Sequence, residues 1–345
     1  MSFTKDLIGG ADGKFDHNSL SALQKVTLRA VVMSFLFYGL ASIEGMIMRM
    51  VEIHPRLAPQ PEFADPTHFF SIMTVHPIVG IFGSTYQLVF AAFTFLVPFL
   101  TKKPLYSVKL ANWTWLQITI GTALAWFAAF IWSYAPLYTL YWPLPADTEQ
   151  FSAIGGVVFI TGVALIMTGT LCFIYNIYAT IFAKVGVHEN KTTKELLISG
   201  FGIDGMLNLW HKITGRPPYS KEPALALPVV AIFRGTVDTF LDALVILGAG
   251  VLVLVFLLAG LGGVHLDVSS VDALLYKNWF WWGLDLVADG LVLIYVAGSW
   301  YLLATLITGQ KLFMENIARA ALMLELLVSW MVWSHHLLAI RGSRR

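Results

Sequence analysis

The chain has 345 residues, of which 57% are hydrophobic and 12% charged, and its formal net charge is +1. A mean hydropathy of +0.71 far exceeds that of a soluble domain and indicates a polytopic membrane protein. The near-zero net charge provides no basic surface for nucleic acid. The single cysteine, Cys172, excludes a disulfide framework and a cysteine-ligated cluster.

Seven apolar segments are each long enough to cross a bilayer, because a hydrocarbon core of about 30 Å needs about 20 residues of helix. They predict an all-α fold, a polytopic bundle of seven transmembrane helices over residues 27–340. A cytoplasmic N-terminal segment (1–26) precedes it and a basic tail (341–345) follows. The polar connection 184–223 is typical of a structured loop, in which 195–210 forms either a short interfacial helix or plain loop. The predicted spans lie near 27–48, 69–99, 113–138, 152–183, 225–260, 279–308 and 316–340.

Lysines and arginines determine the predicted orientation. Most of them fall in the N-terminal segment and in the loops on its side of the bilayer, so the positive-inside rule places the N-terminus in the cytoplasm. Seven spans then place Arg341, Arg344 and Arg345 outside, against that rule. Either a partner's surface neutralises this tail or the number of spans is off by one.

Histidines and carboxylates occur at one predicted depth in three spans. His76 lies in the second span, Asp285 and Asp289 lie one turn apart in the sixth, and His335 and His336 close the seventh. Ionisable groups at membrane depth are costly unless they face the bundle interior and find a partner. Histidine and carboxylate side chains that converge at one level suit a transition metal or heme iron, although a single histidine near a helix end is usually only hydrogen-bonded.

Further charges lie inside the fifth and seventh predicted spans, and one lies in the first. Arg234 and Asp238 are one turn apart, and Asp242 follows one turn later on the same face. This series either relays protons or contains an ion pair that satisfies itself, and Asp242 has no local partner in the sequence. Glu325 is either a station on a path from the inner side to the predicted metal level or an acid that is protonated or paired across helices, and Glu44 is a similar case.

Five stretches, in their order and spacing, resemble the N-terminal seven helices of the catalytic subunit of heme-copper oxidases. The similarity is greatest to the ba3-type branch, which includes several nitric oxide reductases. The resemblance implies that His76 is an axial ligand of a low-spin heme and that His335 and His336 are the paired metal-ligating histidines. The stretches are 73–76 (Met-Thr-Val-His), 96–98 (Leu-Val-Pro), 279–283 (Trp-Phe-Trp-Trp-Gly), 309–313 (Gly-Gln-Lys-Leu-Phe) and 334–336 (Ser-His-His).

The chain departs from the family motif His-Pro-x-Val-Tyr at two positions. Asp285 stands where the family has its first copper-ligating histidine, and Asp289 stands where oxidases have the tyrosine. A carboxylate is a harder ligand that favours iron over copper, as in nitric oxide reductases. The resemblance then implies a non-heme iron or copper held by Asp285, His335 and His336. Asp289 and Glu325 are the candidate catalytic acids.

A second departure is that the family's later helix, which completes both heme sites, has no counterpart in the sequence. The chain is thus expected to be an integral membrane subunit of a prokaryotic terminal oxidase complex that passes electrons from quinol or cytochrome c to oxygen. It is either a degenerate half-length relative, similar to accessory subunits of archaeal quinol oxidases, or half of a split nitric oxide reductase-like catalytic subunit. Its partners would be other membrane subunits, which would share any heme, and the lipid bilayer. A heme-free transporter or proton channel is a third possibility, although no inverted repeat supports it.

Overall fold

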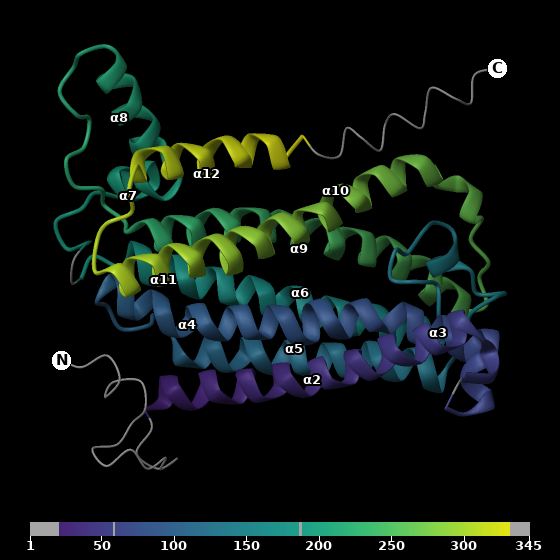
Figure 1. Cartoon of the computed structure of the whole chain (residues 1–345). Coiled ribbons are helices and arrows are strands. Elements are labelled where there is room, and N and C mark those ends of the chain that lie inside the picture. The colour runs from purple at the N-terminus through teal and green to yellow at the C-terminus, as the bar shows by residue number, and fades with distance from the viewer. Residues whose placement is uncertain (1–20, 58, 186–187, 332–345) are drawn as a thin grey trace, which may run out of the picture.

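The computed structural model describes residues 21–57, 59–185 and 188–331, which form a bundle of long helices running roughly parallel to one another (Figure 1). Within these residues, six helices are long and apolar enough to cross a membrane. They confirm the polytopic helical fold and six of the seven predicted spans. The seventh is described only as α12 (Glu315–Ser329), and the rest of it lies outside the described residues.

Two of the six spans contain a π-helical segment between two α-helices. The spans are α2 (Ala22–Ile53), α3 (Pro66–Pro77) with η4 (Ile78–Tyr86) and α4 (Gln87–Thr101), α5 (Val108–Ile131), α6 (Ala153–Phe182), α9 (Leu227–Leu261), and α10 (Ala273–Leu291) with η8 (Val292–Ala297) and α11 (Gly298–Thr308). Short 3-10 turns occupy the connections: η2 (Pro55–Leu57), η3 (Pro61–Ala64), η5 (Leu144–Ala146) and η7 (Val268–Ser270).

Helix bounds differ from the hydropathy prediction at several ends, and the difference is largest at two of them. The third span ends at Ile131 and not at 138, because the chain leaves the helix while still apolar and Ser133 and Leu137 take positive φ values of 50° and 68°. The sixth begins at Ala273 and not at 279, and its polar first turns bury Tyr276 and Asn278. Tertiary packing, and not apolar composition alone, sets these two ends.

Short polar side chains start several of the helices. Ser21 caps α2 in a capping box with Gln24, and Ser107 and Ser152 accept backbone N–H bonds at the starts of α5 and α6. Such caps satisfy N–H groups that would otherwise lack a partner at a helix start. The bilayer spans therefore begin at defined residues.

Glycine pairs allow neighbouring spans to approach closely. A Cβ atom on Gly162 of α6 would lie 2.5 Å from the carbonyl oxygen of Gly121 in α5, and one on Gly290 of α10 would lie 3.3 Å from that of Gly235 in α9. Small residues at such crossings let backbones pack without a side chain between them. The α9–α10 crossing is the one that positions the candidate site described below.

The predicted loop 184–223 contains two helices, α7 (Thr193–Gly200) and α8 (Ile203–Ile213), which decides between the two possibilities left open by the sequence. Both lie at the end of the bundle where α2 begins and where α11 turns into α12 (Figure 1). A third feature at this end is Lys103, whose buried ammonium donates to the carbonyl oxygens of Thr180, Ile181 and Ala183 at the last turn of α6.

Candidate functional site

A buried arginine of α9 joins two helices of the bundle. Arg234 has no exposed surface, and its Nη2 atom lies 2.7 Å from Oε2 of Glu325 in α12 and 3.4 Å from Oδ2 of Asp238. Its Nε atom donates to the backbone oxygen of Leu322 at 3.0 Å. The indole N–H of Trp330 donates to the other oxygen of Asp238 at 3.2 Å. We call Arg234, Asp238, Asp289 and Glu325 the Arg234 cluster.

Asp289 joins this cluster from α10 because the α9 and α10 backbones cross closely beside it. Gly235 and Gly290, the next residues after Arg234 and Asp289, face each other at the crossing, and an added Cβ on Gly235 would also overlap Ile294. Asp289 therefore lies within electrostatic range of Arg234, Asp238 and Glu325. Larger residues at the two glycines would separate the helices and withdraw the carboxylate.

Negative charge exceeds positive charge in the cluster. The guanidinium of Arg234 is the positive group that acts on all three carboxyls, Asp238, Asp289 and Glu325. Asp285 lies one turn before Asp289 and adds further negative potential there. Within a low-dielectric bundle, an arginine and excess carboxylates can lock helices together or hold a proton at an acid that lacks a cation.

A second buried acid of α9 is bonded to the second span. Asp242 is completely buried, and its Oδ2 atom accepts the hydroxyl of Tyr86 at 3.3 Å, while its Oδ1 atom has no hydrogen-bond partner within the described residues. Tyr86 is the last residue of the π-helical segment η4 and packs on Phe90. The sequence did not reveal this pair, because 156 residues separate the two partners.

His76 has a ring geometry compatible with a ligand role. Its Nδ1 atom lies 3.0 Å from the backbone oxygen of Ala41 in α2, and a Cβ on Gly45 would lie 3.1 Å from its Cε1 atom. A carbonyl that accepts from Nδ1 fixes the ring and leaves Nε2 as the nitrogen available to a ligand. Pro77 follows directly and the π-helical segment begins at Ile78, a type of distortion that is frequent at functional sites. His76 thus fits the role of heme ligand.

The predicted metal site is only partly within the described residues. Asp285 and Asp289 are half-buried in α10, whereas His335 and His336 lie outside the described residues. In the described part of the chain, no group of three or more His, Cys, Asp or Glu side chains is placed to hold a metal ion. The arrangement around Asp285, His335 and His336 therefore stays a prediction. The longer α10 also places Asp289 close to the middle of its span.

Two further buried groups have partners that the sequence did not predict. Glu44 of α2 accepts the indole N–H of Trp126 at 2.8 Å, which links α2 to α5 beside the residues that contact His76. Arg319 of α12 is 1% exposed and pairs with Glu315 at 2.6 Å and with Asp204 of α8 at 3.3 Å.

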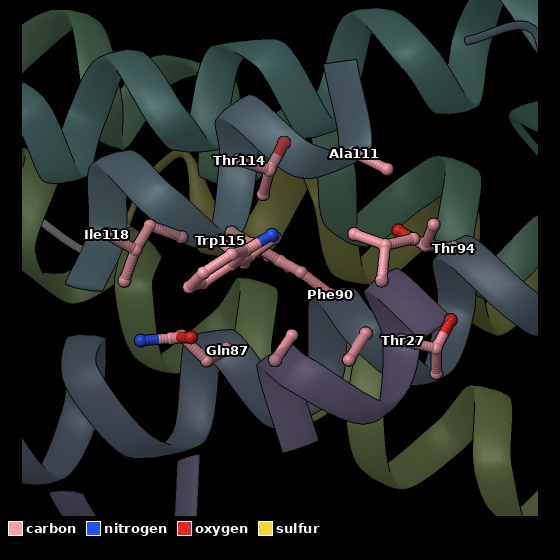
Figure 2. A pocket seen from close by; sticks show the side chains of 11 residues that line it. Thr27, Gln87, Phe90, Thr94, Ala111, Thr114, Trp115 and Ile118 are labelled. Atoms are coloured by element: carbon pink, nitrogen blue, oxygen red, sulfur yellow. The ribbon is translucent and has the colours of Figure 1, made fainter. Parts of the chain in front are cut away.

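A pocket between α2, α4 and α5 contains no titratable side chain (Figure 2). Its polar groups include Gln87, whose amide donates to the hydroxyl of Thr119 at 3.1 Å, together with Thr27, Thr94 and Thr114. Figure 2 shows Trp115 and Phe90 lying across it. This pocket supplies neither an acid, a base nor a metal ligand, so the Arg234 cluster and His76 are the better candidates for function.

Comparison with protein families gives one finding. The family model described as cytochrome c and quinol oxidase polypeptide I matches residues 25–344. The match includes α2 from residue 25 onward, the other five described spans and α12, and it supports the resemblance that the motifs around His76 and in the sixth span had indicated.

Proposed function

Because the chain belongs to the cytochrome c and quinol oxidase polypeptide I family, we propose that it is an integral membrane subunit of a respiratory heme-copper terminal oxidase complex. Members of this family work in multi-subunit oxidases with quinol or cytochrome c as donor. The reaction of the complex would be the transfer of those electrons to oxygen. A prokaryotic cell membrane with the N-terminus in the cytoplasm is part of the same proposal.

The observation that carries the proposed role is the Arg234 cluster. Asp289 stands at the position that resembles the family's motif tyrosine, and it lies within electrostatic range of Arg234, which also binds Glu325 of the next span. A guanidinium at this position favours the ionised forms of the neighbouring carboxyls. We infer that these acids hold α9, α10 and α12 together, and that the chain contributes to assembly and charge balance more than to the redox reaction.

His76 supports a second role within the same complex. Where heme is bound, it supplies electron transfer, and Nε2 of His76 would hold it while Ala41 fixes the ring through Nδ1. Under this second proposal the chain is part of a split catalytic subunit resembling nitric oxide reductases, and Asp285, His335 and His336 hold a non-heme iron or copper. Asp289 and Glu325 would then handle protons for that centre.

Heme and metal analysis of the complex in mild detergent tests these proposals. The first proposal predicts a heme-containing complex whose spectrum is unchanged by His76→Ala. The second predicts that His76→Ala removes one heme signal and that His335→Ala removes iron or copper. His68→Ala is the matched control, because His68 is exposed and lies two turns earlier in the same helix, α3. A purified complex with neither heme nor metal would contradict both proposals.

A further inference from the structure

The described residues of this chain cover the Arg234 cluster only in part. Arg234 contacts α12 through Glu325 and Leu322, and the neighbouring Gly235 contacts α10 at Gly290. The α10–α11 helix and α12 thus lie over the same stretch of α9 (Figure 1). Buried Arg234 and Asp238 form the base of this face, while the Glu325 side chain is 33% exposed. We call the exposed residues beside the cluster, Ala288, Ala321, Leu324 and Val328, together with half-buried Asp289 and Glu325, the acidic face.

The depth of the acidic face makes its exposure costly. Asp289 lies within two residues of the midpoint of the 36-residue span Ala273–Thr308, far from both of its ends. Lipid tails provide neither hydrogen bonds nor counter-charges, and half-exposed carboxyls at this depth are unfavourable unless protein covers them. Two apolar side chains beside these carboxyls, Leu324 and Val328, are 56% and 69% exposed. They add an apolar surface that a second protein can cover together with the acids.

The charges indicate what covers the face. Arg234 is shared by Asp238, Asp289 and Glu325, so the cluster retains excess negative charge when these acids are ionised. A second copy of this chain docked symmetrically would bring the same acids against one another, which is unfavourable. A helix with a cation complements the face.

We propose that the acidic face is the docking site of a transmembrane helix from another chain, and that this helix carries a lysine or arginine at the level of Asp289 and Glu325. The partner's cation would supply the counter-charge that Arg234 alone does not. Its apolar residues would cover Leu324 and Val328. This inference rests on the proposed membership of a multi-subunit complex and adds the surface and the chemistry of the contact.

Site-directed cross-linking in native membranes tests the proposal. Ala288→Cys and Leu324→Cys, each with Cys172→Ser so that no other cysteine is present, would carry a photo-activated cross-linker attached through the thiol. Phe35→Cys is the control, because Phe35 is 62% exposed on the opposite helix, α2. We expect both test sites, and not the control, to capture one membrane chain. The captured peptide should come from an apolar segment that contains a lysine or arginine.

Charge-neutralising variants show whether the acids cause the capture. Asp289→Asn and Glu325→Gln, separately and together, should lower the cross-linking yield at both sites, and the double variant by about tenfold or more. Glu149→Gln, which neutralises an exposed acid in an outer loop, should leave the yield unchanged. The single variants preserve side-chain shape, so they report on charge even if the double variant does not fold.

Several outcomes would overturn the proposal: capture of lipid alone, of a second copy, of this chain's own residues beyond 331, or of a segment that lacks a basic residue. Equal yields with and without the two acids would overturn it as well. The outcome is separable from that of the proposed function. A heme-containing oxidase without capture at these sites refutes only the docking, and capture of a basic helix in a heme-free assembly refutes only the oxidase role.

Discussion

Replacing Arg234 by methionine should destabilise the bundle by about 3–5 kcal/mol, the typical cost of removing one partner from a buried ion pair. The side chain has no exposed surface and makes three polar contacts, to Glu325, Asp238 and the backbone oxygen of Leu322. Methionine fills a similar volume but leaves two carboxyls without their cation. The free energy of unfolding is measurable in mixed micelles by titration with dodecyl sulfate, with helix content followed by circular dichroism.

The chain contains a matched ion pair at the surface. Arg49 and Glu52 are 2.9 Å apart, but their side chains are 74% and 46% exposed, so Arg49→Met should cost only about 0–1 kcal/mol. Adding Glu325→Gln to Arg234→Met should recover about 1–3 kcal/mol relative to the sum of the single changes, because the acid then needs no cation. If Arg234→Met costs no more than Arg49→Met, the cluster does not hold the helices together and the reasoning is wrong.

Two further predictions concern a close helix contact and the pH dependence of stability. Gly235→Val should separate α9 from α10 at Gly290 and lower the midpoint of thermal denaturation in detergent, whereas Gly39→Val, where a Cβ meets nothing within 4 Å, should have little effect. Burial, with nearby lysines, lowers the pKa of His188, whose Nδ1 atom lies 3.1 Å from the oxygen of Ile181. The unfolded chain therefore binds more protons, so stability falls as the pH drops through about 6.5, and this part of the fall should be absent in His188→Gln.

The sequence predicted the spans well because each apolar run is as long as a bilayer is thick. It failed at helix ends, where polar residues such as Asn278 continue the helix and the apolar residues after Ile131 leave it. The Arg234–Asp238 pair was one of two alternatives that the sequence left open, because residues four apart share one helix face. Hydropathy and local spacing are short-range signals.

The rest of the candidate site depends on contacts between distant residues. Glu325 binds Arg234 across 91 residues, and Asp242 binds Tyr86 across 156. Only the packing of α9 against its neighbours brings these groups together, and the glycines that permit it look unremarkable in an apolar run. The motif around His76 was visible in the sequence, but the carbonyl that fixes its ring belongs to another helix. The predicted pair His335 and His336 stays a prediction.

The central claim is that this chain is a subunit of a heme-copper terminal oxidase complex. The most direct measurement is to purify the chain in mild detergent through an N-terminal tag and to record the reduced-minus-oxidised optical spectrum together with oxygen consumption. We predict that other membrane subunits co-purify, that heme bands are present, and that quinol or reduced cytochrome c supports oxygen uptake. A single heme-free chain that is stable alone and consumes no oxygen with either donor would contradict the claim.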